Sequence, residues 1–392
     1  MKPLAARTDA LRQSDIRAVT FAVNRVGGVN LGQGICDLST PEPIVEAAAE
    51  ALRTPGASIY TPYNGIPSLR EALAEKARSF NEIPHDGPAS VVVSTGSTGA
   101  FVSTVLTLCE PGDEVVLFEP FYGYHAGILR LHGVVPVAVP LVPEAGRWTF
   151  DPDRLGAAAT TRTKAVVVCT PANPTGKVWT EAEIDALYAV AERHDLWVVT
   201  DEIYEHMVYD GARHVSPASR PGAFARTVTL SGFSKTFNMT GWRLGYALAP
   251  EAVAAKIGLV NDLEFICAPA PLQHGLAAAL PMPGAYYDRM LADYTVKRAL
   301  MVDTLRAIGL RADPPEGSYY VFAHLGDRLG AEGFEDARAA TETLIDRAGV
   351  ACVPGPSFFA DASDGDGYLR FCYAKEMDVL EDACQRLRGA FG

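Results

Sequence analysis

The sequence has no paired cysteines, few basic residues and no long apolar run. Its 34 lysines and arginines face 47 acidic residues, so the net charge of the 392-residue chain is −13 at pH 7. Such a chain is not expected to bind nucleic acid through the phosphate backbone. No apolar stretch approaches the roughly 20 residues that cross a membrane. The first 15 residues also lack the apolar core of a secretory signal. We therefore expect a soluble protein with no nucleic-acid or membrane partner.

The cysteines and histidines are scattered rather than grouped. The seven cysteines are Cys36, Cys109, Cys169, Cys267, Cys352, Cys372 and Cys384. An odd number without a Cys-x-x-Cys pair gives no sign of a disulfide framework or a zinc site. His125, His206 and His274 lack the spacing of metal ligands and are interpreted as core or surface residues. We expect a cytoplasmic protein, since free thiols are typical of reducing compartments, and no metal in its site.

Short β-branched runs alternate with helical stretches through the middle of the chain. This pattern predicts an α/β domain whose mixed, mostly parallel sheet is flanked by helices. The predicted strands are 91–94, 114–118, 136–139, 165–170, 197–200 and 227–231. A helix is predicted over 181–194, because Thr180 and Glu183 form a capping box at its start. We assign residues 41–280 to this large domain.

The alternation becomes irregular after residue 280. The predicted elements there are helices over 285–308 and 334–348 and strands over 319–322, 350–353 and 368–371. We expect residues 281–392 to form a smaller α+β domain. Residues 1–40 precede the regular alternation and are assigned to this small domain, which both chain termini would then build.

One lysine follows a predicted strand at the position where ligands of open α/β sheets bind. Strand 227–231 leads into Ser234 and Lys235, and Arg243 follows eight residues after the lysine. A partly desolvated lysine amine forms an imine with an aldehyde cofactor. The planar guanidinium of Arg243 suits phosphate oxygens. Together these residues predict a cofactor that carries an aldehyde and a phosphate.

Two neighbouring strands end in groups that suit a pyridine ring. Strand 197–200 leads into Asp201 and Tyr204, and strand 165–170 is followed by Asn173. A buried carboxylate keeps a pyridine nitrogen protonated, which makes the ring an electron sink. The Asn173 amide and the Tyr204 hydroxyl are suited to hydrogen-bond a ring phenolate oxygen.

Small residues follow the predicted strand 91–94. We predict a loop over 94–100, with a helix that begins near residue 100. Backbone N–H groups at a helix start form a phosphate cradle, here including Ser97 and Thr98. A plain strand-to-helix turn is the alternative. The Gly-x-Gly-x-x-Gly spacing of dinucleotide sites is absent, so that interpretation is weaker.

Motifs along nearly the whole chain resemble the class I/II aminotransferases, which are pyridoxal-phosphate enzymes of fold type I. The matching segments are 30–34 (NLGQG), 60–70 (YTPYNGIPSLR), 97–100 (STGA), 173–176 (NPTG), 201–204 (DEIY), 234–245 (SKTFNMTGWRLG) and 368–370 (YLR). Several ordered matches of this kind are highly specific. The resemblance implies pyridoxal 5′-phosphate as cofactor, and an amino acid and a 2-oxo acid as substrates.

The resemblance also implies a role for each matching residue. Lys235 would be the imine lysine, and Asp201 would hold the ring nitrogen. The remaining cofactor-binding residues would be Ser97, Thr98, Tyr122, Asn173, Tyr204, Ser234, Arg243 and, from a partner subunit, Tyr60. Arg370, Asn173 and Gly34 would bind the substrate, with the arginine clamping its α-carboxylate. The contribution of Tyr60 across a subunit boundary implies a homodimer.

The implied reaction is transamination in two halves, with ping-pong kinetics. The sequence departs from the family at Gly232, where a serine that touches phosphate is common, although Ser231 stands one position earlier. No second arginine for a dicarboxylate substrate is evident, so a neutral or aromatic side chain is favoured. Two other functions stay open. One is a C–S β-lyase on the same scaffold, and the other is a regulator that binds the cofactor without turnover, for which the chain lacks a DNA-binding segment.

Overall fold

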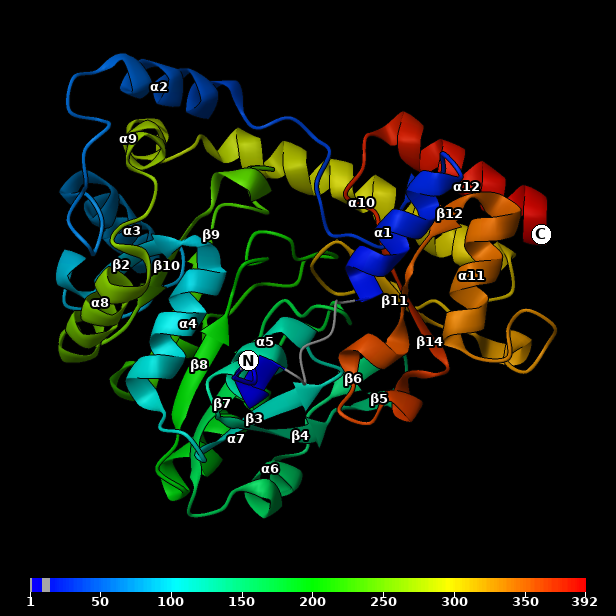
Figure 1. The fold of residues 1–392 in the computed structure, drawn as a ribbon, viewed down its shortest axis with the longest axis horizontal. Helices are drawn as coiled ribbons and strands as arrows, with labels where there is room; N and C mark the ends of the chain where they lie inside the picture. The colour runs from blue at the N-terminus through cyan, green and yellow to red at the C-terminus, as the bar shows by residue number, and fades with distance from the viewer. Residues whose placement is uncertain (1, 9–14) are drawn as a thin grey trace.

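The computed structural model describes residues 2–8 and 15–392, so Met1 and residues 9–14 of the amino-terminal segment lie outside the described residues. Its largest sheet has seven strands, shown in green and cyan in Figure 1. Their spatial order is β2 (Val91–Thr95), β10 (Leu244–Leu248), β9 (Thr227–Gly232), β8 (Trp197–Asp201), β7 (Thr163–Cys169), β3 (Glu114–Glu119) and β4 (Val135–Pro140). Only β10 runs antiparallel to its neighbours, so the sheet is mixed and mostly parallel, as predicted.

Helices cover both faces of this sheet because its strands are apolar on both sides. In β3, Val115 and Leu117 pack toward one face, and Val116 and Phe118 pack toward the other. The first face is covered by α4 (Gly96–Leu108), α5 (Gly123–Leu131) and α8 (Glu251–Phe265). The second face is covered by α6 (Pro152–Ala158), α7 (Glu181–Arg193), α3 (Pro67–Ser79) and α9 (Ala270–Ala279), and α2 (Glu42–Arg53) packs on α9.

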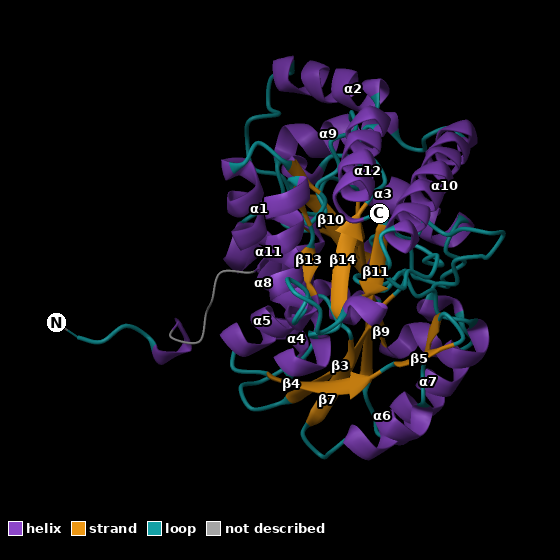
Figure 2. Cartoon of the chain, turned by 90° about the vertical axis from the view of Figure 1, so that its right-hand side faces the viewer, coloured by secondary structure: helices purple, strands orange, loops and turns teal. Residues whose placement is uncertain are grey.

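A second, smaller sheet of three strands is labelled near the middle of Figure 2. Its strands are β11 (Tyr320–His324), β14 (Tyr368–Cys372) and β13 (Val353–Pro354), all antiparallel. Around it lie α1 (Asp15–Arg25), α10 (Gly284–Ala307), α11 (Ala337–Ala348) and α12 (Met377–Phe391). The amino-terminal strand β1 (Val29–Asn30) pairs in parallel with β12 (Val350–Ala351), which joins the two ends of the chain.

Two predicted elements differ from the structure, and one strand of the large sheet was not predicted. The predicted strand over 350–353 is two short strands that break at Cys352, because β12 pairs with β1 whereas β13 pairs with β14. Helix α11 begins at Ala337 rather than at residue 334, since the Asp336 carboxylate caps it by accepting from two backbone N–H groups. Strand β10 was not predicted. In contrast, the capping box of Thr180 and Glu183 is present as predicted.

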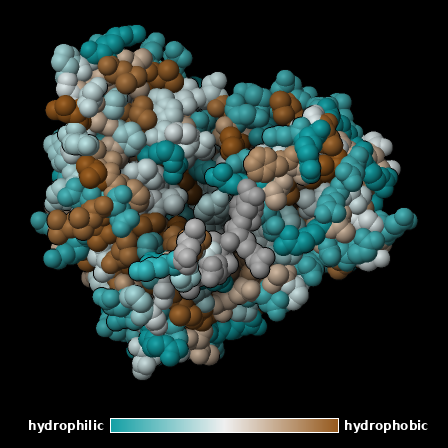
Figure 3. Space-filling model, in the orientation of Figure 1, coloured by the Kyte–Doolittle hydropathy of each residue, from teal (hydrophilic) through white to brown (hydrophobic). Residues whose placement is uncertain are grey.

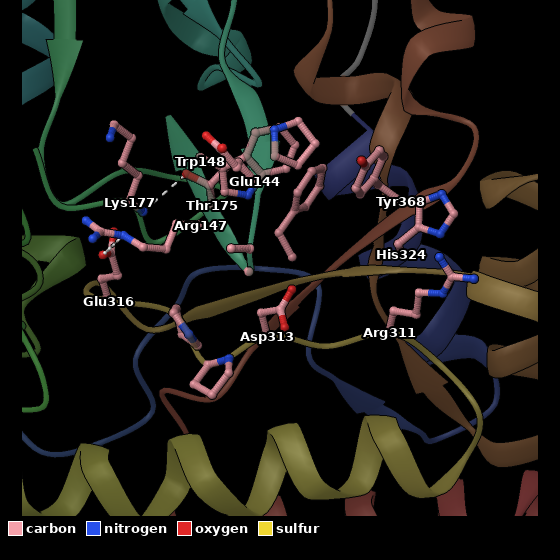
Figure 4. A pocket seen from close by; sticks show the side chains of 16 residues that line it. Glu144, Arg147, Trp148, Thr175, Lys177, Arg311, Asp313, Glu316, His324 and Tyr368 are labelled. Atoms are coloured by element: carbon pink, nitrogen blue, oxygen red, sulfur yellow. Dashed lines mark hydrogen bonds and ion pairs between the residues drawn. The ribbon is translucent and has the colours of Figure 1, made fainter. Parts of the chain in front are cut away.

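A polar cavity of about 300 Å³ lies between a short hairpin and the smaller sheet. One side is the hairpin of β5 (Val142–Glu144) and β6 (Arg147–Thr149), and the other is the connector before β11 and the ends of β11 and β14 (Figure 4). Arg147 pairs there with Glu316 at 2.7 Å. Beside it, the fully buried Lys177 side chain binds Glu183 at 2.5 Å, and burial lowers the pKa of this lysine. The Arg147 pair therefore joins the hairpin to the connector before β11, and the Lys177 pair joins the loop before α7 to that helix.

Glu183→Ala is expected to lower the free energy of unfolding by about 3 kcal/mol, because it leaves the Lys177 charge buried without a partner. It also removes one half of the capping box. The matched control on the same helix is Glu181→Ala, whose exposed pair with Arg220 is worth about 1 kcal/mol or less. Urea unfolding of both variants measures the difference. Equal losses would show that the Lys177 pair contributes nothing beyond a surface contact.

Candidate active site

Lys235 lies in the turn that follows β9, at the carboxyl end of the parallel strands. Its Nζ donates a hydrogen bond to the carbonyl oxygen of Gly34 at 2.9 Å and lies 5.5 Å from the centre of the Tyr319 ring. Burial lowers the pKa of the Lys235 amine to about 8. A substantial fraction of this amine is thus neutral near physiological pH and able to act as a nucleophile or a base.

Asp201 ends β8, the strand next to β9, and its carboxylate is buried. One carboxylate oxygen lies 3.2 Å from Nε2 of His125, a buried residue of α5. Sequence reasoning interpreted His125 only as a core or surface residue. Its contact with Asp201 shows that it positions this carboxylate, and no motif in the sequence indicated the pairing.

Arg370 lies on β14 and reaches from the small sheet toward the large one. Its side chain is 1% exposed, and its guanidinium lies 4.2 Å from the centre of the Tyr320 ring. Nη1 donates to Oδ1 of Asn173 at 2.8 Å, and Nη2 donates to the carbonyl oxygen of Gly32 at 2.6 Å. The buried Nε has no hydrogen-bond partner among the described residues. The guanidinium is therefore held in place and retains a donor for an anion.

Tyr204 and Gly34 complete the wall between Lys235 and Arg370. The Tyr204 hydroxyl lies 3.2 Å from the hydroxyl of Tyr320, and burial raises the pKa of Tyr204, so it stays a phenol. The Gly34 carbonyl accepts from Tyr319 at 3.0 Å as well as from Lys235. A side chain at Gly34 would overlap the Tyr320 hydroxyl. Sequence reasoning missed this use of backbone carbonyls, because residue type does not report it.

The predicted phosphate cradle has a different backbone from the expected loop. Strand β2 continues to Thr95 and α4 begins directly at Gly96, so the prediction of a loop to residue 100 was wrong. Gly96 has φ of +70°, which lets the chain turn from strand to helix without intervening residues. Ser97 and Thr98 lie in the first turn of α4, where backbone N–H groups lack intrahelical partners.

Arg243 stands over this helix start. A side chain at Gly96 would collide with the Arg243 guanidinium, and one at Gly245 would collide with the backbone of Gly96 and Ser97. Among the described residues, the Arg243 side chain donates only to the carbonyl oxygen of Thr240, at 3.0 Å. The guanidinium and the positive end of α4 thus create one anion site.

The remaining predicted residues occupy different surroundings. Tyr122 precedes α5, stacks on Tyr124 with 5.2 Å between ring centres, and meets the His125 ring edge-on at 5.3 Å, beside Asp201. Ser234 is buried directly before Lys235. Tyr60 is 80% exposed on the surface, so this one chain does not bring it into the cleft.

Comparison with known proteins identifies the family of this chain. The family described as "Aminotransferase class I and II" matches residues 26–387. The chain belongs to the class I and II aminotransferases. The aspartate aminotransferase of Pyrococcus abyssi and aromatic-amino-acid aminotransferase 2 of Thermococcus litoralis are each 35% identical to it, over 98% of this chain and 97% of the relative.

A solved structure shares the fold of this aminotransferase. The N-succinyldiaminopimelate aminotransferase from Mycobacterium tuberculosis superimposes with a TM-score of 0.93 at 32% identity, over 99% of this chain and 100% of the other. The predicted fold type I and the predicted enzyme class are therefore confirmed. These relatives are aminotransferases by name, which favours transamination over the C–S lyase alternative. No helix in the described part of the chain is both long and apolar enough to cross a membrane.

Aminotransferases of this family use pyridoxal phosphate, and this chain is one of them. The residues of the cleft fit that cofactor. The anion site at the start of α4 suits its phosphate, because Arg243 has no carboxylate partner among the residues described and two glycines keep the cradle open. The buried Lys235 amine suits its aldehyde, and the buried Asp201 carboxylate suits its ring nitrogen.

Proposed function

We propose that the enzyme transfers the amino group of an L-amino acid to a 2-oxo acid in two half-reactions, with Lys235 as the residue that bonds to the cofactor. The observation that carries this proposal is the Lys235 amine, which is buried, has a lowered pKa and hydrogen-bonds the Gly34 carbonyl. An amine in this state is suited both to bond an aldehyde and to accept a proton.

In this proposal the residues around Lys235 hold the cofactor. Arg243 and the first turn of α4, with Ser97 and Thr98, would bind its phosphate, and Ser234 would add a hydroxyl. The Asp201 carboxylate would keep a proton on the ring nitrogen, and His125 holds that carboxylate in place. When bound, pyridoxal phosphate supplies an aldehyde that exchanges amines and a protonated ring that draws electrons from the substrate.

Asn173, Tyr204 and Tyr122 would complete the cofactor site. The Tyr204 phenol, kept protonated by burial, would donate a hydrogen bond to a ring oxygen of the cofactor, and the Asn173 amide would donate to the same oxygen. Tyr122 lies beside the pair of His125 and Asp201 and would cover the ring face.

Arg370 and Gly34 would orient the amino acid. The Arg370 guanidinium is fixed by Asn173 and Gly32, so its free N–H groups bind an α-carboxylate without reordering the side chain. The Lys235 amine would then take the Cα proton and return it to the cofactor side.

A single-turnover experiment tests the proposed reaction. The enzyme carrying pyridoxal phosphate is mixed with a panel of amino acids in the absence of any 2-oxo acid. We expect the amino form of the cofactor to accumulate and one 2-oxo acid to form per site. Release of pyruvate from a Cβ-substituted amino acid, with return of the lysine-bound spectrum, would contradict transamination and support a β-lyase. A panel of 2-oxo acids then identifies the acceptor.

Cofactor attachment is expected to depend on pH with a midpoint of about 8, because burial lowers the pKa of Lys235 to that value. Below it the amine is protonated, so attachment slows by about tenfold per pH unit as the pH falls, and above it the rate levels. Borohydride trapping of added cofactor on the cofactor-free enzyme, with mass analysis of Lys235, measures the rate. N-acetyl-lysine in solution is the control, with a midpoint near the ordinary value. A Lys235 profile that matches this control would contradict the lowered pKa.

We also infer a homodimer in which Tyr60 of each subunit completes the phosphate site of the other. Apolar side chains are exposed on the left-hand lobe in Figure 3, which carries α2 and α8. They include Leu52 on α2, Leu259 and Leu263 on α8, and Ile59 beside Tyr60. A patch of this kind marks an interaction surface. An active monomer in sedimentation would contradict the dimer.

The seven free cysteines support a reducing compartment such as the cytoplasm.

A further inference from the structure

A cavity of about 530 Å³ lies outside the cleft, behind the turn that carries Lys235. Its walls come from α3, from the residues around the start of α10 and from the turn itself. Phe233 and Phe237 flank Lys235 in the sequence and stack with 6.2 Å between ring centres, and both line this cavity. Phe80, Tyr287 and Met282 add further apolar surface. This volume accommodates a small aromatic molecule.

Lys76 and Glu205 form an ion pair at the base of the cavity, and only the lysine keeps an N–H group without a partner among the described residues. The Glu205 carboxylate binds Lys76 at 2.5 Å and also accepts from Asn81 at 2.7 Å and Ser231 at 2.9 Å. Lys76 has three N–H groups, of which the described residues use two, one for Glu205 and one for the Tyr246 hydroxyl at 3.2 Å. The Lys76 side chain is 23% exposed and lines the cavity, so its third N–H is available to a ligand.

His206 supplies a second polar group without a protein partner. Its ring is stacked between Phe80, at 4.2 Å, and Tyr287, at 4.4 Å. Burial lowers the pKa of His206 to about 3, so the imidazole is neutral at physiological pH. Among the described residues no hydrogen bond satisfies either ring nitrogen, and the residue lines the cavity. It therefore offers one donor and one acceptor to an occupant.

The charges around the cavity select against an ionised occupant. An anionic head would be attracted by Lys76, but Glu205, Glu75 and Asp288 also line the cavity, so the acidic groups outnumber this one lysine. A cationic head at the base would meet Lys76, and the Glu205 carboxylate is already occupied by three donors. An uncharged molecule with a hydrogen-bond acceptor avoids both penalties and satisfies the free Lys76 N–H.

We propose that this cavity is a second binding site for an uncharged aromatic molecule that presents a carbonyl or similar acceptor to Lys76, and that its occupancy changes turnover. The bound molecule would stack on the wall of Phe233 and Phe237, which hold the Lys235 turn from behind. It would also contact Glu205, the residue directly after Tyr204. A ligand there touches the backs of two segments of the proposed cleft, so it acts as an effector and not as a substrate.

Benzamide is the probe, and benzoate is its charged counterpart of nearly the same shape. Calorimetry with the enzyme carrying pyridoxal phosphate measures their binding. Ala72→Trp and Ser79→Trp each add bulk at the lining of the cavity from α3 without removing a charge. Glu71→Trp is the matched control, because this exposed residue of the same helix does not line the cavity. Circular dichroism confirms that each variant is folded.

We expect both cavity variants to weaken benzamide binding at least tenfold, and Glu71→Trp to leave it unchanged. Benzoate bound at the cavity is identified as the benzoate whose binding Ala72→Trp abolishes. At that site we expect benzoate to bind at least tenfold more weakly than benzamide. Saturating benzamide is expected to change kcat at least twofold in the native enzyme and not in Ala72→Trp. Absent benzamide binding, or binding that neither cavity variant weakens, would overturn the site. Binding with an unchanged kcat would overturn the effector role. These binding results do not depend on which amino acid the enzyme uses.

Discussion

Replacing Lys235 by alanine is expected to lower kcat by about 10⁴-fold and to abolish covalent attachment of the cofactor, because one amine both bonds the aldehyde and carries the proton. Burial lowers the pKa of this amine to about 8 in the folded chain, so part of it is neutral and able to react. Steady-state kinetics gives the loss in kcat. Borohydride reduction followed by mass analysis shows whether the cofactor is bonded to the protein.

A surface lysine provides the control for this substitution. Lys256→Ala removes an exposed lysine of α8 and is expected to leave kcat and attachment unchanged. Added methylamine is expected to restore part of the lost rate in Lys235→Ala, since a free amine then carries the proton. Near-native turnover in Lys235→Ala, or attachment at another lysine, would contradict the assignment of this residue.

Arg370→Ala is expected to lower kcat/KM for the amino acid by about 10³-fold, mainly through KM, while the cofactor stays attached. Two charge-assisted hydrogen bonds to a carboxylate contribute about 1.5–3 kcal/mol each, and the substitution removes both. A second measurement uses a substrate analogue, the primary amine that corresponds to the amino acid without its α-carboxylate. The native enzyme is expected to prefer the amino acid strongly over this amine, and the variant is expected to lose that preference.

Arg370 is buried between Asn173 and Gly32, so its removal also affects packing. Arg370→Lys keeps a charge in the same place and is expected to recover part of the affinity, because a lysine makes one of the two hydrogen bonds. Arg130→Ala on the exposed face of α5 is the control for loss of an arginine. If the variant releases the cofactor and keeps a native KM, Arg370 belongs to the cofactor site and not to the substrate site.

Five of the six strands predicted in the sheet lie within observed strands, and the sixth, 165–170, overruns β7 by one residue, because runs of β-branched residues identify buried parallel strands well. Strand β10 escaped prediction since it returns antiparallel from β9 without the helix that usually separates parallel strands. The start of α4 was misplaced because glycine, serine and threonine favour loops by composition. Gly96 is required here by its close contact with the Arg243 guanidinium, and Gly245 by its contact with the backbone at the start of α4. Both requirements come from tertiary packing, which composition does not report.

The motifs indicated the side chains of the cleft but not the contacts that hold them. In the structure Arg370 donates directly to Asn173, and the amino-terminal segment accepts from Lys235 at Gly34 and from Arg370 at Gly32. The partners Gly32 and Gly34 act through backbone carbonyls, which carry no signature of residue type. His125 lies far from Asp201 in sequence, and only the packing of α5 beside β8 makes the pair visible. The role of Tyr60 stays a prediction, because it concerns a second subunit.

The pairing of β1 with β12 has a consequence for the order in which the enzyme is completed during synthesis. The two strands lie near opposite ends of the chain; Gly34 comes shortly after β1, and Arg370 lies on β14, further along the chain than β12. The large sheet can form on the ribosome while the carboxyl-terminal residues are still being added. The glycine carbonyl and the arginine reach Lys235 and Asn173 only after nearly the whole chain has emerged. Under the proposed function, the residues of the large sheet that would bind the cofactor therefore fold before Arg370, which would bind the substrate carboxylate, is in place.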